Sequence, residues 1–263
     1  MYNSRVMKQP IWIAHDDKRV LAGTTTRHGG SSKGEYSQFN LAFHTGDQGK
    51  HVLENRNKFS QLINVPISKM VFTYQSHSTN LKKVTSLDGG KGSTSFEQGI
   101  AADALYTQDK QVLLGVFHAD CVPVFLIHRR QPLIAIVHAG TPGSLQGITA
   151  KVIQQLVKEV NIKPDDLTAY LGPSLDFAHH PIDETKKNQL LKQSSLFQSI
   201  IKKIGGQHYL DIPLLNYMQL IDSGLKPEHV HVSNLDTFSN EEDYFSYDRN
   251  QKTGRHVSFI YLR

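Results

Sequence analysis

Cys121 and His138 are the two residues whose types and positions most readily support chemistry. Cys121 is the only cysteine of the chain, and it follows Asp120 at a break between two apolar runs. His138 ends the next apolar run and precedes Ala139-Gly140. A lone cysteine is commonly an inert buried side chain. A thiolate beside an imidazole, however, can share a zinc ion or act as a nucleophile with its base.

A hairpin between these apolar runs would bring the two side chains together. The turn signal Arg129-Arg130-Gln131-Pro132 separates the runs, and an antiparallel hairpin centred on it pairs residues whose numbers sum to about 261. His138 then lies opposite Pro123, and Cys121 becomes its diagonal neighbour on the same face, roughly 7 to 8 Å away at Cα. At that distance a thiolate and an imidazole can hold one metal ion or hydrogen-bond directly.

A third histidine would complete a zinc site with one open coordination position. Our candidate is His77, which follows a β-prone run and lies within Gln75-Ser76-His77-Ser78. A multicopper oxidase would need several His-x-His pairs around its cysteine, whereas the only such spacing is His229-Val230-His231, far from Cys121 in sequence. Copper redox chemistry is therefore disfavoured.

Strands and helices that could position these residues alternate along the whole chain. Short β-prone runs, apolar or alternating, predict strands at 11–14, 20–25, 71–74, 112–117, 122–127, 133–137 and 257–261. Apolar residues at helical spacing predict a helix from His51 to a stop at Pro66 and another over 147–160. Two further helices are expected over 184–204 and from the cap Asp211 to Gly224. This mixture favours the α+β or mixed α/β class.

Composition excludes several classes of protein. The 263 residues, with 38% hydrophobic residues, suffice for a folded core and exclude a disordered polymer. Lys and Arg number 29 against 24 acids, but they are scattered, so no nucleic-acid partner is expected. The apolar runs are too short to cross a membrane, and the start of the chain lacks a secretory core. One cysteine excludes an intrachain disulfide. We expect a cytoplasmic protein.

The sequence resembles the YfiH-type family of laccase-domain or polyphenol oxidase-like proteins, also known as peptidoglycan editing factors, over nearly its whole length. The motifs that carry the resemblance are Thr25-Thr26-Arg27-His28-Gly29-Gly30, Asn40-Leu41, His44-Thr45-Gly46-Asp47, Asn55-Arg56, Gln75-Ser76-His77, Ala102-Asp103-Ala104-Leu105, Ala119-Asp120-Cys121, Val137-His138-Ala139-Gly140, Gly172-Pro173-Ser174, Phe245-Ser246-Tyr247 and Thr253-Gly254-Arg255. After the His-Ala-Gly motif the family usually has Trp-Arg-Gly, where this chain has Thr141-Pro142-Gly143.

The resemblance implies both a fold and an activity. The implied fold is a single α+β domain over residues 1–263, with two mixed β-sheets packed between helical layers in the order α/β/β/α. The implied activity is that of a zinc-dependent purine nucleoside phosphorylase with adenosine deaminase activity. Its substrates would be nucleosides such as adenosine, inosine, guanosine and methylthioadenosine, together with phosphate, and the protein would be a monomer.

The resemblance also implies the residues of the site. Zinc would be held by His77, Cys121 and His138, two of which the hairpin already pairs. Substrate would be bound by Arg27, His44 and Asn40.

Three residues have both a chemical and a structural interpretation. Arg27, in a glycine- and serine-rich loop, is the candidate cation for phosphate, or else a loop anchor. Asp103 and Asp120 could orient a metal ligand or transfer a proton, although aspartates at strand ends are commonly turn caps.

Two other functions remain open at this point. In a metal-free cysteine hydrolase, Cys121 would be the nucleophile and His138 its base. In a cell-wall quality-control factor, the cellular role would differ from any purine activity. Metal content separates the first alternative from the zinc enzyme, and activity on nucleosides separates both enzymes from the second.

Overall fold

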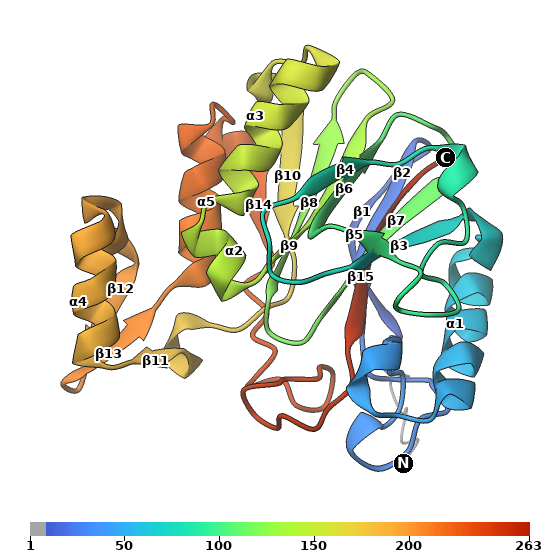
Figure 1. The fold of residues 1–263 in the computed structure, drawn as a ribbon, viewed down its shortest axis with the longest axis horizontal. Coiled ribbons are helices and arrows are strands. Elements are labelled where there is room, and N and C mark those ends of the chain that lie inside the picture. Colours follow the sequence, from blue (N-terminus) through green and yellow to red (C-terminus); the bar gives the residue numbers. More distant parts are fainter. Residues whose placement is uncertain (1–8) are drawn as a thin grey trace, which may run out of the picture.

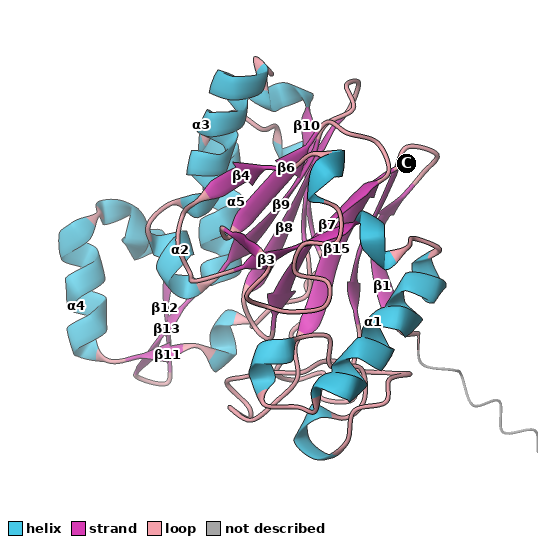
Figure 2. Ribbon diagram, turned by 45° about the vertical axis from the view of Figure 1, so that its right-hand side comes forward, coloured by secondary structure: helices cyan, strands magenta, loops and turns pink. Residues whose placement is uncertain are grey.

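Two six-stranded β-sheets stack face to face in the structure, a computed structural model that describes residues 9–263. Helices cover the outer side of each sheet (Figures 1 and 2). This arrangement confirms the predicted α+β class and the α/β/β/α layering. The predicted domain of 1–263 includes residues 1–8, which lie outside the described residues.

The first sheet is mixed and has the strand order β1-β2-β15-β7-β3-β5. Strands β1, β2, β15 and β7 pair antiparallel with one another in that order, whereas β3 runs parallel to β7 and to β5. The strands span Ile11–Asp16 (β1), Val20–Thr25 (β2), His256–Leu262 (β15), Val112–His118 (β7), Met70–Tyr74 (β3) and Ile100–Ala101 (β5).

The second sheet is also mixed and has the order β14-β10-β8-β9-β6-β4. Its central strands are antiparallel, and parallel strands flank them on both sides. The strands span Val230–Val232 (β14), Leu167–Leu171 (β10), Val122–His128 (β8), Ile134–Ala139 (β9), Ala104–Thr107 (β6) and Leu81–Lys83 (β4).

The space between the sheets is filled by alternate residues of the facing strands. Leu114 and Ile260 of the first sheet belong to the same buried cluster as Phe125 and Ile136 of the second. Because side chains alternate along a strand, the neighbours of these residues point to the opposite faces of their sheets. Both sheets therefore bury both faces, which explains why β7, β8 and β9 are apolar runs without alternation.

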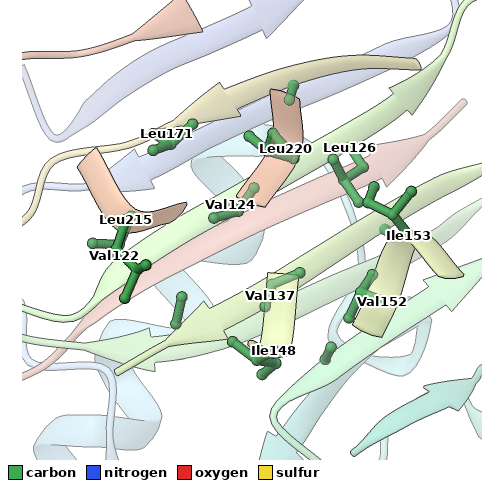
Figure 3. Packing of buried hydrophobic residues seen from close by; sticks show 14 of the residues in the cluster. Val122, Val124, Leu126, Val137, Ile148, Val152, Ile153, Leu171, Leu215 and Leu220 are labelled. Carbon is green, nitrogen blue, oxygen red and sulfur yellow. The ribbon is translucent and has the colours of Figure 1, made fainter. Parts of the chain in front are cut away.

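Helices close the two outer faces. On the second sheet, α3 (Ile148–Val160) and α5 (Ile212–Asp222) pack against β8, β9 and β10 (Figure 3). The short helix α2 (Thr141–Leu145) directly follows β9. On the first sheet, α1 (Gly49–Ile63) places Phe59 against Phe259 of β15, with ring centroids 5.0 Å apart.

The predicted hairpin register is confirmed. Pro123 of β8 pairs with His138 of β9, and the ladder continues to Ile127 opposite Ile134. Pro123 and His138 therefore have the same orientation as Phe125 and Ile136, which point into the space between the sheets. Cys121, two residues before Pro123, follows the same alternation at the end of the hairpin.

One predicted helix is wrong in its second half. The helix expected over 184–204 ends at Gln193 (α4, Glu184–Gln193), and Ser194 then caps a short 3-10 turn through a hydrogen bond from Leu196 N. The last residues form β12 (Ile201–Ile204), which pairs with β13 (Gln207–Leu210) across Gly205-Gly206. Both glycines have positive φ, so a tight hairpin forms at the end of the segment that the sequence predicted to be helical.

These elements make a small third sheet of order β11-β13-β12, in which β11 spans Pro181–Ile182. With α4 it projects from one side of the two main sheets (Figure 1). The helix predicted from Asp211 is confirmed as α5, whose first turn is capped by the Asp211 carboxylate accepting from Leu214 N. Among the described residues, no helix has the length and apolar character needed to span a membrane.

Candidate metal centre

His77, Cys121 and His138 lie together at one end of the sheets. One potential ligand atom from each residue lies within 4.8 Å of the other two, so the three side chains could hold a metal ion. His77 comes from the loop after β3, Cys121 from the tight turn between β7 and β8, and His138 from β9. Within residues 9–263 this is the only group of three or more His, Cys, Asp or Glu side chains so placed.

The three side chains can lie together because the backbone at Gly140 approaches His77 and Cys121 closely. A Cβ atom added at Gly140 would lie 2.3 Å from His77 Nδ1 and 3.2 Å from Cys121 Sγ, so only glycine leaves room for these side chains. The backbone is also strained on both sides, because His77 has φ 58° and Asp120 has φ 90°. Such strain at residues that carry chemistry is a common sign of a site held in place by its surroundings.

Asp103 supplies that support on the His77 side. Its carboxylate accepts hydrogen bonds from the backbone amides of Ser76, His77 and Ser78 at 3.2, 3.0 and 2.7 Å. The Ser78 hydroxyl donates a further bond at 2.7 Å. Since the side chain of Asp103 is fully buried, it fixes the loop that carries His77.

Asp103 also orients His138. The Nδ1 atom of His138 lies 2.9 Å from Asp103 Oδ1, and both side chains are buried. Burial alone would raise the pKa of Asp103, but the hydrogen bonds from His138 and Ser78 lower it to about 2. The carboxylate is therefore ionised and Nδ1–H donates, which leaves His138 Nε2 as the ligand atom. One of our two interpretations of Asp103, a ligand-orienting residue, matches this geometry.

The same surroundings favour positive charge at the triad. Burial would lower the pKa of His138, but the Cys121 sulfur and Asp103 outweigh it and raise this pKa to about 9. By contrast, burial and the neighbouring His138 lower the pKa of His77. A site that stabilises a proton between the Cys121 sulfur and a carboxylate also stabilises a metal cation there.

Asp120 uses both carboxylate oxygens to bond groups other than the three ligands. Its Oδ1 accepts from the Thr237 hydroxyl at 2.7 Å and its Oδ2 from Asp248 N at 2.8 Å. Both oxygens are thus used to hold the loop 236–248 beside Cys121. The catalytic role expected for Asp120 remains a prediction, and the contacts seen are those of a positioning residue.

Two of the expected substrate residues are engaged elsewhere. Arg27 donates from Nε and Nη2 to Ser37 O and from Nη1 to Glu241 O, which makes it a loop anchor in this structure. Asn40 is fully buried and bonds Ala42, Thr45 and the amide of Arg255. The structure brings neither side chain into contact with the triad.

His44, the third expected substrate residue, lies nearer the triad. Its ring packs on Phe96 at 4.1 Å and on Phe117 at 5.7 Å between centroids. Partial burial, then Arg255, Arg56 and His138, lower its pKa to about 4. The imidazole is therefore neutral at neutral pH and adds no charge to the site.

Arg255 is a cation of the site that sequence reasoning did not assign. Its charge interacts favourably with Cys121 and Asp120 and lowers the pKa of His77. Nη1 donates to Thr253 O and Gly254 O, each at 3.0 Å. Among the described residues, Nε and Nη2 have no hydrogen-bond acceptor. The Thr253-Gly254-Arg255 motif was the available signal.

A cavity of about 160 Å³ opens beside Cys121. Its polar wall contains Thr141, His180, Tyr247 and Asp248, none of which was predicted as a site residue, and Leu175 and Ile212 line its apolar part. These residues come from four separate segments of the chain. The cavity gives a small molecule access to the neighbourhood of the triad.

Comparison with known proteins places the site in context. A family model described as "Multi-copper polyphenol oxidoreductase laccase" matches residues 21–263. Purine nucleoside phosphorylase YlmD of Bacillus subtilis (strain 168) is 33% identical over 253 residues, which cover 94% of this chain and 90% of that protein.

Two solved structures have the same fold. The hypothetical protein YfiH of Bacillus licheniformis superposes with a TM-score of 0.92 at 29% identity, with all of both chains covered. YlmD of Geobacillus stearothermophilus superposes with a TM-score of 0.87 at 30% identity, covering 94% of this chain and 93% of that one. The similarity therefore extends over the whole arrangement of sheets that brings the three ligands together.

Proposed function

Since this chain belongs to the family described as multi-copper polyphenol oxidoreductase laccase, we propose that it is a zinc-dependent purine nucleoside phosphorylase with adenosine deaminase activity. Its substrates would be adenosine, inosine, guanosine and methylthioadenosine, with phosphate as the second substrate. The observation that carries the proposal is the His77, Cys121 and His138 group, held by Asp103 and close to the cation Arg255. The name of the relative from Bacillus subtilis supports the choice of reaction.

The ligand set suits zinc better than copper. Two imidazoles and one thiolate leave one position open, which is the arrangement of a catalytic zinc site. A multicopper centre needs several groups of histidines, and the described residues provide one group of three ligands. A zinc ion bound there would supply Lewis-acid chemistry and lower the pKa of its bound water towards about 7.

Phosphorolysis needs a cation for the attacking phosphate. In this reaction the bond between ribose C1′ and the purine nitrogen breaks, its electron pair leaves with the base, and a phosphate oxygen bonds to C1′. Arg255 offers its unpaired Nε and Nη2 donors near Cys121, whereas the donors of Arg27 are occupied by backbone carbonyls. We therefore assign phosphate binding to Arg255.

Deamination requires the same site to admit water. Water replaces the 6-amino group of adenosine, which leaves as ammonia. Asp103 keeps His138 in one tautomer and His77 in place, so the geometry does not have to reorganise during the reaction. Asp120 contributes by holding Asp248 and the loop that closes the cavity.

The test combines metal analysis with two activity assays. Purified protein should contain about one zinc per chain, cleave inosine in phosphate and convert adenosine to inosine. His77→Ala and Cys121→Ser should lose the metal and both activities, whereas His229→Ala, a histidine paired with Asp165 at the surface, should keep them. Full metal and full activity in His77→Ala would contradict the proposal.

A metal-free cysteine hydrolase is the second candidate, favoured by the proximity of the Cys121 sulfur to the His138 ring, with Asp103 bonded to the other side of the imidazole. A thiolate activated by such a pair attacks carbonyl carbon. This enzyme would be inactivated by alkylation and indifferent to a strong chelator. The zinc enzyme, in contrast, would lose activity with the chelator and regain it with zinc.

The setting of the enzyme is part of the same proposal. We place it in the cytoplasm, as a monomer that acts on free purine nucleosides and phosphate and has no nucleic-acid partner. Light scattering and cell fractionation test these points directly.

A further inference from the structure

We propose that the cavity beside Cys121 is the subsite for the purine base, and that Asp248 and His180 recognise hydrogen-bond donors on the edge of that base. This inference rests on the proposed function and adds the part of the substrate that determines specificity. The relevant donors are the 6-amino group of adenine and the N1–H and 2-amino groups of guanine.

The size and lining of the cavity suit a planar ring system. Its volume of about 160 Å³ is below the roughly 300 to 1,000 Å³ of sites that enclose a complete ligand, so it fits a fragment such as the base. Leu175 and Ile212 offer apolar contact for the faces of a ring, and Tyr247 adds an aromatic one. The ribose and phosphate would then extend towards Arg255.

The backbone around Asp248 is fixed while its carboxylate is available. Asp248 N donates to Asp120 Oδ2, and the next residue, Arg249, donates to the carbonyls of Thr237, Phe238 and Tyr244. Within the described part of the chain, the Asp248 carboxylate itself has no hydrogen bond or ion pair. It lines the cavity, so an N–H group of a ligand can be its partner.

The backbone of His180, another lining residue, is likewise fixed by hydrogen bonds. Its amide donates to Phe177 O at 3.0 Å and its carbonyl accepts from Leu210 N at 3.0 Å. Its imidazole lines the cavity and has no hydrogen-bond partner among residues 9–263. Burial lowers the pKa of His180, so a neutral ring with one donor and one acceptor faces the ligand.

The charges lining this cavity exclude phosphate from it. Asp120 and Asp248 are the charged side chains of the wall, and no Lys or Arg lines it. The cation Arg255 is not among the lining residues and lies against the ring of Tyr247, 5.3 Å from its centroid. Burial and Asp120 both raise the pKa of Asp248, as expected for a carboxylate that gains from a donor. The site thus has an acidic part for the base and a cationic part for the anion.

The experiment measures kcat/KM for phosphorolysis of adenosine, guanosine and purine riboside, which lacks an N–H donor on that edge. Wild type should prefer the two donor-bearing nucleosides by roughly tenfold or more, since a hydrogen bond to a charged acceptor is lost with purine riboside. Asp248→Asn should reduce this preference about tenfold, because its amide is a weaker acceptor and a competing donor. The nucleoside whose kcat/KM falls more in Asp248→Asn identifies the edge of the base that Asp248 contacts.

Two controls separate this inference from general damage. Glu241→Gln removes a carboxylate from the same exposed loop but outside the cavity and should leave all three values unchanged. His180→Ala should weaken the same preference by a smaller factor. An equal loss on all three nucleosides in Asp248→Asn, or an unchanged preference, would overturn the inference.

Binding of free bases keeps the inference testable without turnover. Calorimetry of adenine, guanine and purine should show the same preference in wild type and its loss in Asp248→Asn. If wild type cleaves no nucleoside but shows this binding preference, the proposed function fails and the base subsite stands. If nucleosides are cleaved with no such preference, the subsite fails and the proposed function stands.

Discussion

Two buried aspartates flank the metal triad, and they organise its two sides differently. Asp103 accepts bonds from three consecutive backbone amides, a serine hydroxyl and His138, so it fixes two of the three ligands directly. The Asp120 carboxylate bonds the Thr237 hydroxyl and the amide of Asp248, neither of which belongs to a ligand. Under the proposed function, the Asp103 side orients the metal ligands, whereas the Asp120 side holds the loop that would contact the substrate.

The difference matters because the two tasks need different rigidity. Metal affinity depends on ligands that are already oriented. Substrate recognition needs side chains that are positioned but unpaired, as His180 and Asp248 are on the Asp120 side. Substitutions on each side, and a lowered pH, test whether the two sides separate these tasks.

The largest effect is expected from Asp103→Ala. It leaves His138 Nδ1 and three amides without their buried partner, and breaking such a buried ionic network costs about 3 to 5 kcal/mol. Metal affinity should fall by about 10 to 100-fold or more through loss of ligand orientation. Urea unfolding of the metal-free protein and a metal titration measure the two effects.

Asp120→Asn is the matched control for that variant. It should cost about 1 to 3 kcal/mol through weakened hydrogen bonds and raise KM for the nucleoside, while metal content stays close to that of wild type. If both variants lost metal equally, the proposed division between the two sides would be wrong.

An intermediate effect on stability is expected when the pH is lowered. His256 is fully buried, and its Nε2 accepts from the amide of Phe245 in the segment that leads to Tyr247. Burial lowers the pKa of His256 from 6.5 to about 3. The unfolded chain therefore binds a proton that the folded chain does not between these pH values, and stability falls as pH decreases through that window by up to about 1.4 kcal/mol per pH unit.

The Asp103 side should resist acid to a lower pH. The pKa of Asp103 is lowered from 3.8 to about 2, so its stabilising contribution is complete above about 4 and is lost only as pH falls towards 2. Hydrogen exchange, corrected for intrinsic rates, should show Phe245 losing protection below pH 6 while Ser76–Ser78 stay protected. Simultaneous loss in both segments would show that the two sides unfold as one unit.

The smallest effect is expected from Tyr247→Leu. The Tyr247 ring is 43% exposed and carries the Arg255 guanidinium at 5.3 Å, a contact worth about 0.5 to 1 kcal/mol at an exposed position. The KM for phosphate should rise about two- to fivefold, with metal content unchanged and stability lowered by no more than about 1 kcal/mol. Tyr247→Phe keeps the ring and should behave as wild type in steady-state kinetics.

The core of the site was predictable because its geometry is local. The turn at Pro132 fixes the register of β8 and β9, and the period of two along a strand then places Cys121 beside His138. His77 was selected among the other histidines by its position after a β-prone run, and a resemblance to known proteins supported the choice. The layered arrangement followed from the same resemblance, and the mixture of predicted strands and helices gave the fold class.

The rest of the site depends on tertiary contacts that no local pattern records. Loops bring three further residues to the site, namely Arg255, His180 and Asp248. The paths of such loops are set by hydrogen bonds such as the one from Asp248 N to Asp120 Oδ2. Arg27 illustrates the converse, because a glycine-rich loop suggested a phosphate contact while its donors satisfy backbone carbonyls. The helix expected over 184–204 failed since Gly205-Gly206 and the isoleucines of β12 favour a hairpin over continued helical spacing.

The position of β15 has a consequence for synthesis. This strand lies between β2 and β7, although it follows both of them and every other described strand in sequence. A ribosome adding about 5 to 20 residues per second leaves β2 and β7 waiting on the order of ten seconds for their shared neighbour. Until then their facing edges are unpaired and open to association with other nascent chains.

The site residues are also synthesised at different times. The three candidate ligands, His77, Cys121 and His138, emerge well before β15, but Arg255 emerges immediately ahead of it. The metal ligands can therefore be in place during translation, whereas the cation beside them arrives only with the strand that closes the sheet.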